Sequence, residues 1–285
     1  MKLKRLYSFS SFLDQQGWVS PLASTTNIHE KMLDKSLDAL FPKTKKSDQP
    51  FLLDPLTILK KAFKNISSYG SSTAWIWTIQ NRILKVANLG DSGLILLRYN
   101  YQKCQSRVIL WTRDQQHDFN TPFQLANIPK RAKSKAHKEQ PFWEDDPNSA
   151  EIYTSKVKSG DIVLLGTDGL FDNLFLDDIL EITNDFIKSL CHVKVTDHHA
   201  NYGSPSTDVS NYSIEFTQDH SLILAKRLAK AAKTRSKCQK TMSPFEKKWN
   251  KYLVKKKRNS PKDIDELFWQ GGKKDDIGVV VAFTK

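Results

Sequence analysis

Short segments rich in β-branched and aromatic residues follow one another closely along the middle of this chain. Turn residues such as the Gly-Asp-Ser-Gly at 90–93 separate the segments between residues 73 and 112, where the gaps are too short for a helix. Because parallel strands need a long crossover connection, strands this close together are expected to pair antiparallel. The pattern predicts an α+β domain with strands at residues 73–79, 83–88, 94–98, 106–112, 152–157, 161–166 and 277–283.

Helices are predicted before and between these strands. Asp54 followed by Pro55 is typical of a helix start, and apolar residues then recur at helical spacing to about residue 67. The same spacing predicts helices over 177–190 and 221–232. Two polar segments are expected to be irregular: a loop at 130–138 and a surface insertion at 192–220.

The positive charge of the chain is concentrated in one segment. The 285 residues include 44 Lys or Arg and 31 Asp or Glu, a formal net charge of +13, and the basic segment 226–262 holds 15 of the basic residues with a single acid, Glu246. The lysines of the helix at 221–232 are expected to coat its solvent side. Residues 255–258 have no apolar partner face and are expected to form an exposed loop. No aromatic stacking or finger pattern accompanies the charge, so no specific nucleic-acid partner is predicted.

Other compositional features narrow the class of protein. Hydrophobic residues make up 39% of the chain, which suffices for the core of one large domain or two small ones. The longest apolar runs are far shorter than the roughly 18 residues that a membrane span needs. Three scattered cysteines, Cys104, Cys191 and Cys238, are too few for a disulfide framework, so free thiols in a reducing compartment are expected. We expect a monomer without a membrane span.

The N-terminal composition suggests a targeting segment. Residues 1–13 contain basic residues, serines and apolar residues and no acid, as in a mitochondrial presequence, so a mitochondrial or cytoplasmic location is predicted. We expect residues 1–16 to be an N-terminal segment, either a presequence or truncated first strands. Residues 17–285 are expected to form one domain, with a polar insertion at about 192–220 and the basic segment 226–262.

Carboxylates occur at three turns next to predicted strands. Asp91 lies in the turn at 90–93, Asp168 directly follows an apolar strand, and Asp275 precedes the last strand. Carboxylates at the ends of neighbouring strands form an oxygen-rich cleft, and hard cations such as Mg²⁺ or Mn²⁺ prefer such ligands. Taken singly, each turn favours the simpler alternative, a hairpin turn without chemistry.

Taken together and in this order, the motifs resemble those of the protein phosphatase 2C family, the PPM class of metal-dependent serine/threonine phosphatases. Residues 115–125 and 243–245 look like the branch of that family typified by mitochondrial members. The resemblance covers roughly residues 17–282. Its main motifs are Gly-Ser-Ser-Thr-Ala at 70–74, Ala-Asn-Leu-Gly-Asp-Ser at 87–92, Thr-Asp-Gly-Leu-Phe-Asp-Asn at 167–173 and Gly-Lys-Lys-Asp-Asp-Ile at 272–277.

The resemblance implies a four-layer αββα sandwich of two antiparallel sheets flanked by helices, with a two-metal cleft at one edge. Asp168 and Asp275, not Asp276, match the family's metal ligands and are the expected catalytic residues. Two Mg²⁺ or Mn²⁺ ions would activate a water that hydrolyses the phosphomonoester of a phosphorylated protein substrate. Asp91 is expected to fix a turn, and His117 is expected to have a structural role.

The sequence departs from the family near its start. The family carries an Ala-Asp-Gly-Val-Gly-Gly-Trp motif whose aspartate bridges both metals, and here only Gly17-Trp18 matches it. With Trp18 aligned, Leu13 takes the place of that aspartate, and Asp14, one position away, becomes the candidate third metal ligand. Loss of the bridging carboxylate would weaken a two-metal site, because closely spaced cations need shared negative charge.

Three functional hypotheses follow. The first is a working serine/threonine phosphatase in which Asp14 takes the bridging role. The second is a catalytically impaired phosphatase-fold protein that binds phosphoproteins, or an N-terminally shortened gene product. The third is a basic adaptor for acidic partners, such as nucleic acid or a membrane surface, that uses the segment 226–262. The family resemblance ranks the phosphatase first.

Overall fold

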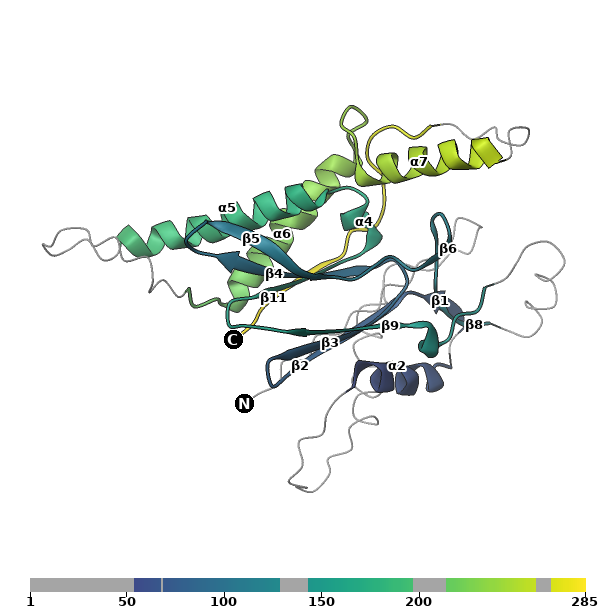
Figure 1. Cartoon of the computed structure of the whole chain (residues 1–285), viewed down its shortest axis with the longest axis horizontal. Helices are drawn as coiled ribbons and strands as arrows, with labels where there is room; N and C mark the ends of the chain where they lie inside the picture. Colours follow the sequence, from purple (N-terminus) through teal and green to yellow (C-terminus); the bar gives the residue numbers. More distant parts are fainter. Residues whose placement is uncertain (1–53, 68, 129–142, 197–213, 260–267) are drawn as a thin grey trace, which may run out of the picture. The chain divides into compact units, whose positions relative to one another are not determined.

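The computed structural model describes residues 54–67, 69–128, 143–196, 214–259 and 268–285 (Figure 1). These residues fall into two compact units. The first comprises the described residues of Met1–Asp91 and Asp114–Lys156, and the second those of Ser92–Arg113 and Val157–Lys285. Each unit combines antiparallel sheet with helix, so the predicted α+β class is confirmed.

The first unit is built on a three-stranded antiparallel sheet in the order β2-β3-β9. Its strands are β2 (Ala74–Gln80), β3 (Ile83–Leu89) and β9 (Glu151–Lys156). Two small antiparallel sheets accompany it, and their strands are β1 (Gly70–Ser72) with β8 (Leu125–Asn127) and β6 (Gln116–Asp118) with β7 (Thr121–Pro122). The 3-10 helix η1 (Pro147–Ser149) precedes β9.

Helix α2 (Pro55–Lys64) closes the core of this unit and begins where the sequence predicts. The carboxylate of Asp54 accepts hydrogen bonds from the Thr57 backbone N–H at 3.0 Å and from the Thr57 hydroxyl at 2.9 Å. Ile58 and Leu59 of the helix are buried in one cluster with strand residues such as Leu89. The helix ends at Lys64, three residues earlier than predicted, because the chain leaves helical geometry at Asn65.

The N-cap of α2 gives a direct test of this local structure. Replacing Asp54 with Ala should lower the free energy of unfolding by about 1 kcal/mol, because the first turn loses its side-chain acceptor. Asp54→Ser, which keeps an acceptor oxygen, should recover most of the loss. Denaturant unfolding monitored by circular dichroism measures both variants, and equal stability of Asp54→Ala and the wild type would contradict this role.

The second unit is built on a four-stranded antiparallel sheet in the order β11-β10-β4-β5. Strand β10 (Ile162–Gly166) lies inside the sheet, and all five of its residues are buried. Leu164 pairs with Ile95 on one side and with Val281 on the other. The other strands are β4 (Gly93–Asn100), β5 (Gln105–Trp111) and β11 (Val279–Phe283).

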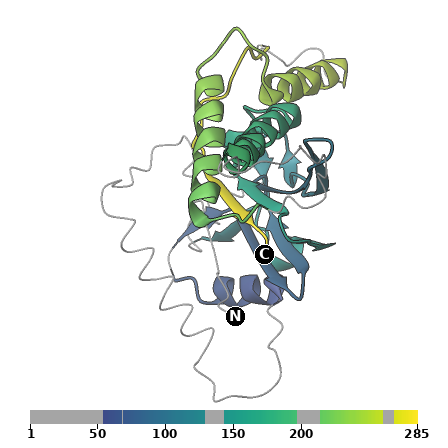
Figure 2. The ribbon, with the colours of Figure 1, turned by 90° about the vertical axis from the view of Figure 1, so that its left-hand side faces the viewer.

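Helices α5 (Leu176–Thr196) and α6 (Gln218–Ser236) cover this sheet, and α6 packs along β11 (Figure 2). The sequence patterns at 177–190 and 221–232 predicted the centres of both helices. Two further helices, α4 (Asp168–Phe171) and α7 (Pro244–Asn259), complete the unit. None of the described helices has the length and apolar character needed to cross a membrane.

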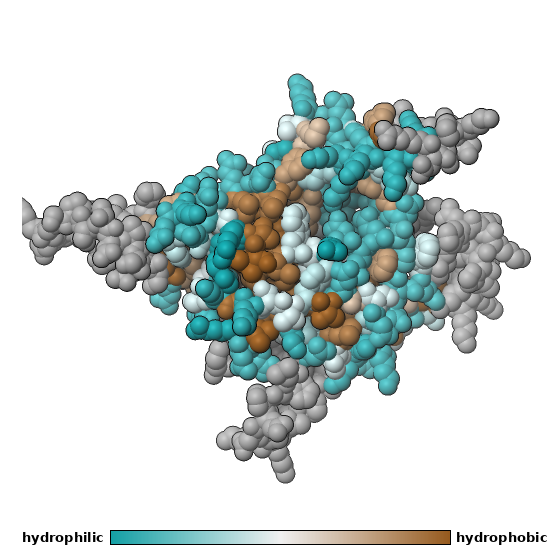
Figure 3. Space-filling model, in the orientation of Figure 1, coloured by the Kyte–Doolittle hydropathy of each residue, from teal (hydrophilic) through white to brown (hydrophobic). Residues whose placement is uncertain are grey.

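Two expectations for the polar segments are wrong in part. Residues 255–258 lie in α7, not in a loop, because the lysine stems find aromatic rings to cover: Lys256 lies over Tyr252 and Lys257 over Phe268. In Figure 3, the part of the face that α7 occupies is largely hydrophilic, in agreement with the many lysines of this helix. The expected insertion at 192–220 is shorter than predicted, since α5 continues to Thr196 and α6 begins at Gln218. The loop predicted at 130–138 lies outside the described residues.

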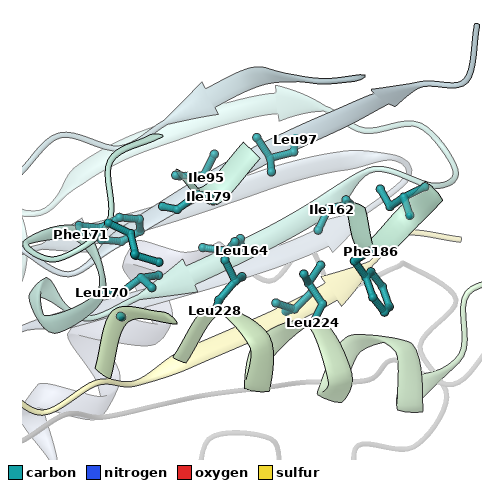
Figure 4. Close-up of a cluster of buried hydrophobic side chains, with 14 of the residues drawn as sticks. Ile95, Leu97, Ile162, Leu164, Leu170, Phe171, Ile179, Phe186, Leu224 and Leu228 are labelled. Carbon is teal, nitrogen blue, oxygen red and sulfur yellow. The ribbon is translucent and has the colours of Figure 1, made fainter. Parts of the chain in front are cut away.

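The core of the second unit holds sheet and helices together (Figure 4). Leu164 of β10 lies among side chains from α5 and α6, including Ile179 and Leu228. Leu170 and Phe171, which follow β10 directly, belong to the same cluster. The turn after β10 is therefore fixed by apolar burial, which contributes about 1.5–3 kcal/mol for each fully buried side chain.

Candidate functional site

The candidate site begins where β10 ends. Thr167 is the N-cap residue of α4, so Asp168 is the first residue of that helix. The Thr167 backbone N–H donates to the Gly278 carbonyl at 3.1 Å, and the Gly278 N–H donates to the Thr167 hydroxyl oxygen at 3.0 Å. The Thr167 hydroxyl donates in turn to the Asp276 carbonyl at 3.0 Å. These bonds tie the approach to β11 to the end of β10 and bring Asp275 close to Asp168.

A glycine allows the two segments to approach so closely. A Cβ atom on Gly169 would collide with the backbone carbonyl of Asp276. Because Gly169 has no side chain, the segments pack backbone against backbone. This packing explains the Asp-Gly pair of the strand-end motif.

Three carboxylates converge on one ammonium group. The Nζ atom of Lys273 lies 2.8 Å from Asp168 Oδ2, 3.0 Å from Asp172 Oδ2 and 3.0 Å from Asp275 Oδ2. A lysine ammonium has three N–H donors, so the three acids match its full donor set. We call these four residues the Lys273 cluster.

The remaining carboxylate oxygens are held from outside the cluster. Asp168 Oδ1 accepts the Gly169 backbone N–H at 2.8 Å, and Asp275 Oδ1 accepts the Asp276 backbone N–H at 2.8 Å. Asp172 Oδ1 faces the Nζ atom of Lys248 on α7 at 3.8 Å. Each acid therefore presents one oxygen to the shared centre while its other oxygen meets a donor or a positive charge elsewhere.

The loop that carries Lys273 is clamped by α7 and by the end of α6. The Gly271 N–H donates to Glu246 Oε2 at 2.7 Å, and the Ser243 hydroxyl donates to the Gly271 carbonyl at 2.6 Å. The Gly272 N–H donates to the Cys238 carbonyl at 2.9 Å. A side chain at position 272 would collide with the backbone of α6, so this approach also requires glycine.

Asn173 joins the two halves of the cluster. Its side-chain amide N–H groups donate to the carbonyls of Gly169 and Lys273, both at 2.9 Å. Its side-chain carbonyl accepts the Lys273 backbone N–H at 3.0 Å. The Asn173 side chain is fully buried, and its bond to the Gly169 carbonyl is buried as well, while its two bonds to Lys273 are partly buried.

Burial and charge act together on the ionisation of the cluster. Burial raises the pKa of Asp172 above its usual value, and the positive charges of Lys273 and Lys248 only partly oppose this. Burial, followed by the neighbouring charge of Asp168, raises the pKa of Asp275. Burial on its own would lower the pKa of Lys273, but the charges of Asp172 and Asp168 outweigh it and raise that pKa. Lys273 is therefore held as a cation.

Comparisons with known proteins identify the kind of protein to which this site belongs. No family model matches the chain. It is 28% identical over 268 residues to the probable protein phosphatase 2C 55 of Arabidopsis thaliana, an alignment that covers 94% of this chain and 44% of that protein. It is 37% identical over 140 residues to the protein phosphatase PTC7 homolog fig of Drosophila ananassae, covering 47% of this chain and 39% of that one. The solved structure of the photosystem II phosphatase PBCP matches with a TM-score of 0.52 and 27% identity, covering 81% of this chain and 71% of that chain.

Over 94% of its length the chain is similar to protein phosphatase 2C proteins. The chain is also similar to PTC7 homologues, and the mitochondrial type of branch suggested by residues 115–125 and 243–245 stays a prediction. The likeness to PBCP agrees with the predicted αββα sandwich as the fold class. The chain spans less than half the length of the Arabidopsis relatives, 44% of one and 49% of another.

The carboxylates of this site are the kind of ligand that a divalent cation prefers, while their distances to Lys273 are those of bonds to an ammonium. Three convergent carboxylate oxygens are the ligand type that Mg²⁺ and Mn²⁺ prefer. Their distances of 2.8–3.0 Å to Lys273 Nζ are those of charge-assisted hydrogen bonds, whereas Mg²⁺ takes its ligands at about 2.0–2.1 Å. Consistent with this, no group of three or more His, Cys, Asp or Glu in the described part of the chain is arranged as a metal site. A hard cation could bind these oxygens only in place of the Lys273 ammonium.

The structure brings some of the predicted site residues together and places others elsewhere. The structure brings Asp168 and Asp275 together, and Asp14 lies outside the described residues. Asp91 is buried in the turn after β3. His117 is stacked on both faces, by Phe123 at 4.1 Å and Trp143 at 4.2 Å between ring centroids. Its Nε2 atom lies 3.0 Å from Asp145 Oδ2, a packed arrangement that supports the structural role.

Two residues of the cluster, Asp172 and Lys273, and the neighbouring Asn173 were not predicted from the sequence. Asp172 and Asn173 lie inside the strand-end motif, and their spacing from Asp168 by about one helical turn was the available signal. Lys273 follows two glycines in a charged stretch and has the sequence appearance of a solvent-exposed loop residue. Hydrogen bonds from distant residues, among them Glu246, Ser243 and Asn173, hold its loop in the interior.

The bonds of Asn173 predict a large cost for its removal. Asn173→Ala should lower the free energy of unfolding by about 2 kcal/mol, because one buried and two partly buried backbone groups lose their partners. Asn148→Ala, at an exposed position, serves as the matched control and should change stability little. Urea unfolding of both variants checks this, and similar stability of the two would contradict the linking role of Asn173.

Proposed function

We propose that this chain is a metal-dependent protein serine/threonine phosphatase that hydrolyses phosphomonoesters. The observation that carries the proposal is the convergence of Asp168, Asp172 and Asp275 at the ends of paired strands. The homology to protein phosphatase 2C proteins supports it along 94% of the chain. Because the chain spans less than half of those relatives, the activity rests on the site and not on their names alone.

Asp168, Asp172 and Asp275 would hold the cation, with Mg²⁺ or Mn²⁺ as the ions suited to carboxylate ligands. A divalent ion bound there would activate water and offset the charge of the phosphoryl oxygens. We extend the proposal to two ions, with Asp14 as the bridging ligand, on the strength of the family resemblance.

The chain's own residues prepare the site in two ways. The backbone N–H groups of Gly169 and Asp276 fix one oxygen of Asp168 and of Asp275, so that the other oxygen of each faces the centre without reorientation. Lys248 beside Asp172 is about half exposed and adds a positive charge at the surface of the site. That charge would attract a phosphoryl dianion from solvent.

The proposal also names a substrate, an oligomeric state and a location. A phosphorylated serine or threonine in a protein is the proposed substrate, and a monomer is the proposed state. The name of PBCP refers to photosystem II, which is a property of that protein. A mitochondrial or cytoplasmic location is supported only by the composition of residues 1–13.

One observation favours a second candidate function. Lys273 already neutralises part of the acid cluster, as a residue would that stabilises a phosphatase fold without metal. The second candidate is therefore a catalytically impaired phosphatase-fold protein that binds phosphoproteins. The basic adaptor for acidic partners is less well supported, because α7 takes part in the clamp around Gly271.

Activity assays on matched aspartate variants test the proposed function. The wild type should hydrolyse an aryl phosphate with Mn²⁺, and chelation should abolish this. Asp168→Asn and Asp275→Asn should each reduce kcat/KM by more than about a hundredfold, since loss of an outer-shell partner alone costs about 10- to 100-fold. Asp276→Asn removes the neighbouring exposed carboxylate and should leave activity within about twofold of the wild type.

The outcomes separate the two candidates. A folded wild type with no Mn²⁺-dependent hydrolysis of aryl phosphates or phosphopeptides would reject the enzyme and favour the binding protein. Circular dichroism spectra of the variants confirm that any loss of activity is not a loss of fold.

A further inference from the structure

The ammonium of Lys273 and a divalent cation need the same three carboxylate oxygens. The Nζ atom lies within 3.0 Å of one oxygen from each of Asp168, Asp172 and Asp275. A cation at about 2.1 Å from those oxygens would overlap the ammonium. We infer that Lys273 is an internal competitor of the divalent cation, and that the metal enters only when the Lys273 side chain swings out. The inference rests on the proposed function only in requiring a divalent cation at this cluster.

The charges of the cluster make such an exchange favourable. The three carboxylates carry three negative charges, which Lys273 and the nearby Lys248 offset by two, so a formal charge of −1 remains when all are ionised. A divalent ion in place of the ammonium would bring the formal charge to zero. Partly buried charges gain most from full compensation, since screening by water is weak there.

The backbone around Lys273 is held independently of its side chain. Gly271 is bonded to Glu246 and Ser243, Gly272 to Cys238, and the Lys273 backbone N–H and carbonyl to Asn173. None of these bonds uses the ammonium. The side chain can therefore leave the cluster while the loop keeps its position, and a variant at this residue is expected to retain the loop.

The environment of the ammonium also favours its occupation of the cluster without metal. Its side chain is only 13% exposed, and Nζ lies 5.0 Å from the centre of the Phe245 ring, within range of a cation–π contact. A site occupied by its own lysine is competent for metal only in the fraction of molecules in which the lysine is out. The apparent dissociation constant for metal is raised by the inverse of that fraction.

Calorimetric titration of the full chain with Mn²⁺, after chelation, tests the competition. Lys273→Ala removes the competing ammonium and should bind Mn²⁺ at least about tenfold more tightly than the wild type. Lys274→Ala makes the same charge change at the next, exposed residue and should bind like the wild type. Equal or weaker Mn²⁺ binding by Lys273→Ala, or no binding by either protein, overturns the inference.

A second measurement uses the wild type alone and decides the matter even if Lys273→Ala fails to fold. Acetylation by an activated ester, quantified by mass spectrometry, reports which lysines are free. Without metal, Lys273 should be protected, and saturating Mn²⁺ should raise its rate of acetylation by about tenfold or more while Lys274 stays unchanged. Protection of Lys273 that persists at saturating Mn²⁺ overturns the inference.

The two proposals can fail separately. A chain that binds Mn²⁺, releases Lys273 and hydrolyses no phosphoester fails only as a phosphatase. A chain that hydrolyses phosphoesters with Mn²⁺ while Lys273 stays protected fails only the competition.

Discussion

The candidate site depends on a single electrostatic arrangement, the ammonium of Lys273 set among Asp168, Asp172 and Asp275. Three carboxylates this close would repel one another strongly in a partly buried setting. A cation at their centre turns the repulsion into attraction. Lys273 supplies that cation from within the chain, and the same geometry makes the cluster a candidate site for a divalent ion.

The architecture brings these residues together from positions about 100 residues apart in the chain. Asp168 lies just after strand β10. The pairing of β10 with β11 places the segment with Lys273 and Asp275 beside it. Two glycines, Gly169 and Gly272, let backbones meet where any side chain would collide. The apolar core beneath the sheet keeps both strand ends in place, so chemistry at the surface of the unit relies on burial inside it.

The sequence predicted those parts whose signals are local. β-branched and aromatic residues together with turn residues located the strands of the two larger sheets to within two residues, and Asp54-Pro55 located the start of α2. The short strands β1, β6, β7 and β8 were not predicted. The pair Asp168 and Asp275 was found through the family motifs. The basic end of α7 was missed because its partners, such as the Phe268 ring, lie beyond the helix in the chain. Lys273 was missed for the same reason, since bonds to distant residues bury it.

The most direct test of the central arrangement is nuclear magnetic resonance of the lysine ammonium groups in the metal-free chain. An ammonium fixed by three carboxylates exchanges its protons slowly with water and shows couplings across its hydrogen bonds to the aspartate carboxyl carbons. We predict one such slowly exchanging signal with couplings to Asp168, Asp172 and Asp275, absent from Lys273→Ala. If every lysine ammonium exchanges at the rate of a solvent-exposed side chain, the arrangement described for this cluster is wrong.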